Sequence, residues 1–100
     1  GICPTDIDLM YERRGHFLIL EGKRSGATFP IGQRRFYDAL HHPPQFIVVH
    51  FYGSPPDQVT SFGRWGAAAK PGDTAALIAA VQTWFAWVEA RAAYPNSRVG

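Results

Sequence analysis

The chain has 100 residues, 46% hydrophobic and 18% charged, which predicts one folded domain over residues 1–100 and excludes a disordered tail. Its formal net charge of +2 is a mild basic excess, which on its own only weakly favours a nucleic-acid partner. The single cysteine, Cys3, excludes an intrachain disulfide and favours a reducing compartment, so we expect a cytoplasmic protein.

Two β-prone runs near the N-terminus predict a hairpin. Residues 6–11 alternate polar and apolar side chains, and residues 16–20 are apolar and run on into a charged segment at 21–23. A charged turn that contains glycine, at residues 12–15, joins the two runs. Residues 27–31 are open to two interpretations, a short third strand or an extended entry into the next element.

A helix is predicted over residues 32–42, because Phe36 and Leu40 are spaced four apart on one face. A Pro-Pro pair directly after it ends the helix. His41 and His42 lie in its last turn, where a positive charge is favourable. We therefore interpret these two histidines as helix-end residues rather than metal ligands.

The run at residues 45–52 is almost continuously apolar and β-branched. Such a run predicts a strand that is buried on both faces, in a central or parallel position. His50 lies within it and is interpreted as a core histidine. Residues 58–65 predict a short edge strand that ends at a glycine, and residues 67–72 predict a linker.

A final helix is predicted over residues 73–93, with Asp73 or Thr74 as its N-cap. Trp87 lies off its apolar stripe and is either a second packing contact or a residue that faces a partner, which leaves open a homodimer through this helix. The most apolar window, residues 77–88, is shorter than the ~20 residues that cross a bilayer, so no membrane partner is expected. The stripe consists of Leu77, Ile78, Val81, Trp84, Phe85 and Val88.

Charged side chains share one face of the predicted hairpin. Asp6 and Asp8 are two apart, as are Glu21 and Lys23, so each pair lies on one face of its strand. If the strands pair around the turn, carboxylates and an ammonium meet near one end of the sheet. Crowded carboxylates repel one another, and a hard divalent cation such as Mg²⁺, with Mn²⁺ as substitute, would satisfy them. The alternative is a hairpin without a functional site, whose charged residues are solvated and form only an exposed ion pair.

Asp8, followed thirteen residues later by Glu21-Gly22-Lys23, resembles the signature of the PD-(D/E)XK, or restriction-endonuclease-like, nuclease superfamily. By this resemblance, Asp8 and Glu21 are metal ligands, the backbone carbonyl of Gly22 is a further ligand, and Lys23 is the catalytic lysine. The middle position, Gly22, more often holds a β-branched or apolar residue in the superfamily.

The next predicted helix extends the resemblance. Gln33 and Tyr37 stand at i and i+4, similar to the Gln-x-x-x-Tyr motif of RecB-type members and to the Gln-bearing helix of the VRR-NUC branch. In those proteins this helix borders the site, and its glutamine contacts the site or DNA. The resemblance covers residues 6–52. The residues expected to bind nucleic acid are Tyr37 and the arginines Arg24, Arg34 and Arg35, with the arginines contacting the backbone phosphates.

The resemblance implies an α/β fold, a small mixed β-sheet flanked by helices, with a restriction-endonuclease-like core that lacks the usual N-terminal helix. It implies Mg²⁺-dependent hydrolysis of phosphodiester bonds in nucleic acid, with DNA as the expected partner, by endo- or exonucleolytic cleavage. The catalytic set would be Asp8, Glu21, Lys23 and Gln33. The alternative function is a catalytically inactive module of the same fold that binds DNA or another protein.

Overall fold

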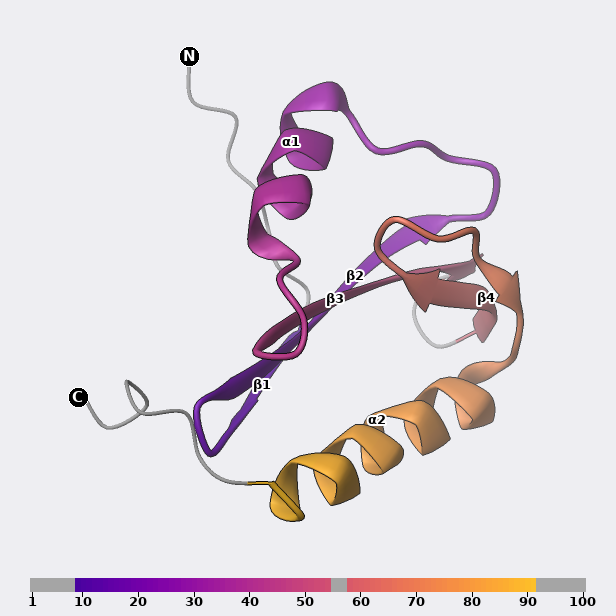
Figure 1. Ribbon diagram of the computed structural model, residues 1–100. Helices are drawn as coiled ribbons and strands as arrows, with labels where there is room; N and C mark the ends of the chain where they lie inside the picture. Colours follow the sequence, from indigo (N-terminus) through magenta and orange to yellow (C-terminus); the bar gives the residue numbers. More distant parts are fainter. Residues whose placement is uncertain (1–8, 55–57, 92–100) are drawn as a thin grey trace.

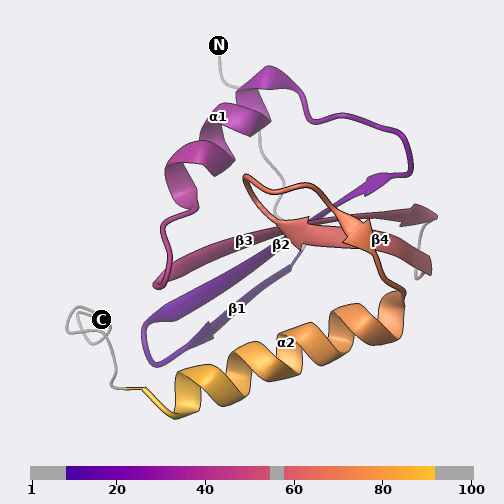
Figure 2. The same cartoon turned by 45° about the vertical axis from the view of Figure 1, so that its right-hand side comes forward.

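The computed structural model describes residues 9–54 and 58–91, which form a five-stranded mixed sheet and two helices. Helix α1 (Ile31–Leu40) lies between the second and third strands of the chain, and helix α2 (Thr74–Glu89) follows the last strand. The helices lie on opposite faces of the sheet (Figures 1 and 2), so the expected α/β fold with a mixed sheet flanked by helices is confirmed. The strands are adjacent in chain order: β1 (Leu9–Arg13), β2 (His16–Arg24), β3 (Phe46–Ser54), β4 (Gln58–Arg64) and β5 (Lys70–Pro71).

Strands β1 and β2 form the predicted antiparallel hairpin. Its two central turn residues, Arg14 and Gly15, have φ of 55° and 80°, the left-handed pair that matches the twist of two adjacent strands. The amide of Gly15 donates to the carboxylate of Glu12 at 2.9 Å, which closes the turn. Asp6 and Asp8, expected in the first strand, lie outside the described residues.

Strand β3 is central, as predicted, because it pairs in parallel with β2 and antiparallel with β4. Two parallel neighbours need a long crossover, and α1 supplies it. The segment before α1 is the extended entry rather than a third strand, with Pro30 at its end. Helix α1 ends at Leu40, two residues before its expected end, because the backbone of His41 is already extended.

The predictions of an edge strand at residues 58–65 and a linker at 67–72 were wrong in one respect. Strand β5 lies within the expected linker and pairs antiparallel with β4, with Lys70 opposite Phe62. The amide of Gly72 also donates to the carbonyl of Thr60 at 3.0 Å. A two-residue strand carries no periodic pattern, so only its pairing reveals it.

Helix α2 begins with the predicted cap and ends early. The side chain of Asp73 accepts from the amide of Ala76 at 2.8 Å, so Asp73 rather than Thr74 is the N-cap. The hydroxyl of Thr74 instead accepts from the amide of Val59 at 2.9 Å, which fastens the helix to β4. The last helical residue is Glu89, not a residue near 93, because the chain closes with i to i+3 hydrogen bonds there.

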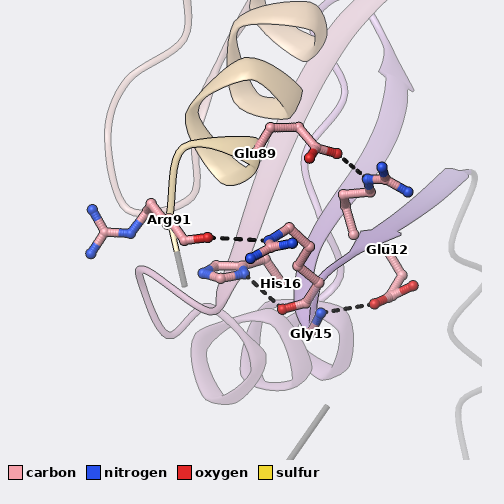
Figure 3. A network of polar contacts seen from close by, with 7 residues as sticks. Glu12, Gly15, His16, Glu89 and Arg91 are labelled. Atoms are coloured by element: carbon pink, nitrogen blue, oxygen red, sulfur yellow. Dashed lines mark hydrogen bonds and ion pairs between the residues drawn. The ribbon is translucent and has the colours of Figure 1, made fainter. Parts of the chain in front are cut away.

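Figure 3 shows how the hairpin turn is held against the end of α2. Arg13 forms an ion pair with Glu89, and the Nε of Arg14 donates to the carbonyl of Arg91 at 3.1 Å. The ring of His16 is buried, and its Nδ1 lies 3.2 Å from the carbonyl of Arg14. These contacts join the first and last described elements of the domain.

Trp87 packs against this same corner. Its ring meets the ring of His16 edge to face at 5.7 Å, and the guanidinium of Arg91 lies 4.3 Å from its centroid. It remains 36% exposed. The packing interpretation of Trp87 is therefore confirmed, and the homodimer stays a prediction. Neither helix within residues 9–54 and 58–91 has the length and apolar character needed to span a bilayer.

Alternation along β2 and β3 creates two apolar cores. The core under α2 contains most of the predicted stripe, although Ile78 is 52% exposed and lies outside it. The α1 face buries Ile19, Phe29, Tyr37 and Val48, and the α2 face buries Leu18, Leu20, Ile47, Trp84 and Val88.

Gly22 faces the α2 core and lies opposite Phe51 in the β2–β3 ladder. A Cβ at position 22 would overlap the Phe51 ring, so the ring occupies the space that any other residue would need. A glycine in a strand interior often marks such a close approach. The glycine in the middle of Glu21-Gly22-Lys23 thus has a packing reason.

We expect Gly22→Ala to destabilise the domain by ~1–3 kcal/mol, the usual cost of adding a methyl group to a filled core. Urea unfolding followed by tryptophan fluorescence measures this. The control is the pair Phe51→Leu and Gly22→Ala/Phe51→Leu, in which the alanine has room. Equal costs of Gly22→Ala in both backgrounds would contradict the steric explanation.

Candidate active site

The buried carboxylate of Glu21 is the centre of the candidate site. Glu21 lies in the second half of β2 on the α1 face, and its side chain is 3% exposed. The hydroxyl of Tyr37 in α1 donates to its Oε1 at 2.7 Å. Burying a carboxylate is costly unless hydrogen bonds or opposite charge compensate it. The alternative prediction of a solvated charge at position 21 is wrong, because this side chain is buried.

Gln33 and Tyr37 are the two buried residues of α1, one turn apart on the same face. This is the arrangement that the Gln-x-x-x-Tyr spacing predicts. The Oε1 of Gln33 is buried and has no hydrogen-bond partner within the described part of the chain. An unpaired buried amide oxygen costs about 1–3 kcal/mol, so this atom is suited to accept a donor or a cation.

Lys23 follows Glu21 on the same face of β2. It is half-buried, and its Nζ lies 5.2 Å from the ring centroid of Phe29. An ammonium over an aromatic face gains about 0.5–2 kcal/mol, depending on how far it is desolvated. The sequence predicted that Glu21 and Lys23 share one face. It did not predict that the ring of Phe29 would lie beside the ammonium of the lysine.

Phe29 is the middle of an aromatic cluster behind the site. Its ring centroid lies 5.1–6.4 Å from those of four neighbours, all in edge-to-face geometry. The position of Phe29 in the sequence, after the turn that follows β2, does not predict this cluster, because its rings come from four separate segments of the chain. The four neighbours are Tyr37, His50, Tyr52 and Trp65.

His50 lies opposite Glu21 in the β2–β3 ladder and is confirmed as a core histidine. Its Nε2 lies 3.0 Å from the carbonyl of Ala67, which can only accept, so Nε2 carries the proton. Its Nδ1 lies 3.2 Å from the hydroxyl of Tyr52. Burial raises the pKa of Tyr52, which keeps that hydroxyl protonated as a donor. The imidazole is thus held in one tautomer.

The three arginines expected to contact phosphates are exposed but do not share one surface, whereas Tyr37, the fourth residue expected to contact nucleic acid, is fully buried beside Glu21. Arg34 and Arg35 lie on α1, whereas the alternation of β2 places Arg24 on the α2 side of the sheet, away from Lys23. Their role with nucleic acid stays a prediction. Of the three, Arg34 and Arg35 are on the helix that carries Tyr37.

The metal ligands are only partly accounted for. Asp8 lies outside the described residues, and within residues 9–54 and 58–91 no group of three or more His, Cys, Asp or Glu could hold a metal ion. Glu21 and the neighbouring backbone of Gly22 are the described members of the predicted set. Mg²⁺ at this position stays a prediction.

Comparison with known proteins identifies no relative of this chain at the level of significance required. A scan against protein-family models finds no match, and neither curated proteins nor solved structures show a significant one. The resemblance to the PD-(D/E)XK superfamily therefore rests on the residues of the motif alone.

His41 corrects the expectation of a favourable cation at the end of α1. Its Nδ1 accepts a hydrogen bond from the amide of Val48 at 3.0 Å, which needs that nitrogen unprotonated. Burial, and then the positive charge of Arg64, lower its pKa below 6.5. The helix end is therefore completed by a neutral imidazole.

The hydrogen bond from Tyr37 to a buried carboxylate predicts that Tyr37→Phe destabilises the domain by about 2 kcal/mol. Thermal and urea unfolding measure the change. The matched control is Tyr11→Phe on the other face, because the described residues offer no partner to the Tyr11 hydroxyl. Its expected cost is under ~0.5 kcal/mol. Equal losses in the two variants would contradict the assigned role of the Tyr37 hydroxyl.

The lowered pKa of His41 predicts loss of stability in acid. Because the unfolded chain takes up this proton near pH 6.5 and the folded chain only at lower pH, stability should fall as pH drops below about 6.5. We expect His41→Asn, whose amide oxygen can still accept from Val48, to flatten the dependence of melting temperature on pH between 7.5 and 5.5. His42→Asn, at an exposed position, should keep the wild-type slope. An unchanged slope in His41→Asn would refute the assignment.

Proposed function

We propose that the chain is a Mg²⁺-dependent nuclease that hydrolyses phosphodiester bonds of DNA at a site formed by Asp8, Glu21 and Lys23. The observation that carries the proposal is the hydrogen bond from Tyr37 to Glu21. It joins the two halves of the motif, the strand that carries Glu-x-Lys and the helix face that carries Gln-x-x-x-Tyr. Their separation in sequence is 16 residues, so the spacing alone did not require them to meet.

The donor atoms fit a hard cation. The carboxylate of Glu21 and the orphaned amide oxygen of Gln33 are oxygen donors, the class that Mg²⁺ prefers. The proposal also requires Asp8. The last described pair of the hairpin is Leu9 with Leu20, and Asp8 precedes Leu9 in the sequence, outside the described residues.

The side chains then have separate tasks. A bound Mg²⁺ would polarise a phosphate oxygen and lower the pKa of a coordinated water. Lys23 stabilises the negative charge that develops on the phosphate, since its ammonium shares a strand face with Glu21. Tyr37 fixes the orientation of the Glu21 carboxylate, and the amide of Gln33 orients the substrate. The aromatic cluster around Phe29 packs against the ring of Tyr37 and so helps to hold this donor in place.

Purified wild-type chain should cleave single-stranded, nicked or branched DNA in Mg²⁺ or Mn²⁺ and lose this activity in EDTA. Lys23→Ala should lower the rate by about 100-fold or more, the usual effect of removing a donor that stabilises charge in the transition state. Arg13→Ala, a cation lost from the opposite end of the hairpin, should leave the rate unchanged. If no substrate is cleaved, or if wild type and Lys23→Ala cleave equally, the nuclease proposal fails.

The second candidate is a binding module without catalysis. One observation favours it: Glu21 already accepts from Tyr37, and Lys23 already packs on Phe29, so both side chains have structural partners without a metal. Calorimetric titration with Mn²⁺ separates the two candidates. Binding that is lost in Asp8→Asn and Glu21→Gln supports the nuclease. The absence of such binding, together with a gel shift of DNA that weakens in Arg34→Ala/Arg35→Ala, supports the module.

A further inference from the structure

A cavity of about 680 Å³ lies between the middle of α2 and the sheet, on the face opposite Glu21. Helix α2 meets β4 through Thr74 and meets β1 through Phe85, whose ring lies 5.5 Å from that of Tyr11. Between these two attachments the helix spans the sheet, and the cavity lies beneath it. Its walls are mainly apolar, and the deepest belong to Leu18, Leu20, Ile47, Leu77 and Trp84.

Two cations line one side of this cavity, Arg64 of β4 and Lys70 of β5. The ladder places Lys70 opposite Phe62, and Arg64 is two residues from Phe62, so both side chains project from the α2 face as diagonal neighbours. Within residues 9–54 and 58–91, no acidic residue lines the cavity and neither cation takes part in an ion pair. A ligand has two unneutralised positive charges to meet.

The positive charge of Arg64 also acts on a neighbouring histidine. It contributes, after burial, to the lowered pKa of His41, which stands on the loop that leads into Pro43 and Pro44 at the cavity. The positive charge of Arg64 therefore acts at this side of the cavity.

We propose that this cavity binds a small amphipathic carboxylate, a molecule with an apolar chain or ring and one anionic head. Its volume lies in the ~300–1,000 Å³ range of small-molecule sites, and an apolar wall with few convergent polar groups is typical of them. The apolar body lies against the leucines and Trp84, and the carboxylate accepts from Arg64 and Lys70. A cationic amphiphile would be repelled, and a neutral one would leave both charges without a partner.

A second copy of this chain is the less favourable occupant. Its formal net charge of +2 offers no complement to a cationic mouth. The inference does not depend on the nuclease proposal, because Glu21 and Lys23 project from the other face of the sheet. A domain that fails to cleave DNA could still bind this ligand, and the reverse also holds.

Decanoate is the probe, below its micellar concentration, and the fluorescence of Trp84 and Trp87 in the cavity wall is the signal. We expect saturable binding of decanoate and at least tenfold weaker binding of decyltrimethylammonium, which has the same chain and the opposite charge. Arg64→Gln and Lys70→Gln are exposed substitutions that should each weaken decanoate about tenfold. Arg13→Gln, a cation lost outside the cavity, should leave binding unchanged.

Ala80→Phe tests the place of binding, since Ala80 lines the cavity and a phenyl ring there takes up part of the space that a ligand would need. This variant should stay folded by circular dichroism and lose decanoate binding. Equal affinity for the two amphiphiles, binding that survives Ala80→Phe, or no saturable binding would overturn the proposal. Light scattering tests the alternative that a second copy of the chain occupies the cavity. A dimer that Ala80→Phe converts to monomers would make the cavity an interface between copies and would also overturn the proposal.

Discussion

The strict alternation of side chains along β2 is the constraint on which the rest of the domain depends. This strand is paired on both edges and covered by a helix on each face, so every side chain has one permitted direction. Odd positions give Ile19, Glu21 and Lys23 to the α1 face. A slip of one residue would bury Glu21 and Lys23 in the α2 core and move the leucines to the α1 face, so the register is firmly set.

Two local devices hold that register. The left-handed pair at Arg14 and Gly15 fixes where the hairpin reverses, and the Phe51 ring beside Gly22 fixes β2 against β3. The second device also changes how the Glu21-Gly22-Lys23 triplet is understood. Its glycine serves the packing of the α2 face, whereas its two charged residues serve the α1 face. One short segment therefore satisfies two unrelated demands on opposite sides of the sheet.

Local pattern was enough to predict the elements whose causes are local. The hairpin, the buried strand β3 and the start of α2 follow from alternation, an apolar run and two adjacent capping residues, of which the structure uses Asp73. Strand β5 did not follow, because two residues carry no period and only pairing with β4 defines them. The neutral state of His41 also depends on distant groups, the amide of Val48 and the charge of Arg64.

The candidate site also combines features with local causes and features that depend on distant parts of the chain. Spacing predicted that Glu21 and Lys23 share a face and that Gln33 and Tyr37 share another. It could not predict that the two faces meet, because the hydrogen bond from Tyr37 depends on how α1 crosses the sheet. The aromatic support of Lys23 was hidden for the same reason: its rings come from separate segments, and Trp65 is anchored to Asp38, 27 residues away, by its indole N–H.

A buried carboxylate at the centre of the domain links stability to function. A hydroxyl donor favours the charged form of a carboxylate, and burial disfavours it, so the Glu21–Tyr37 pair balances two opposing effects. A cation bound beside Glu21 would remove the burial cost and, by binding only the folded chain, would stabilise it. In a binding module the contacts of the folded chain, the hydrogen bond from Tyr37 among them, must offset that cost. The two candidate functions thus differ physically in what balances one buried charge.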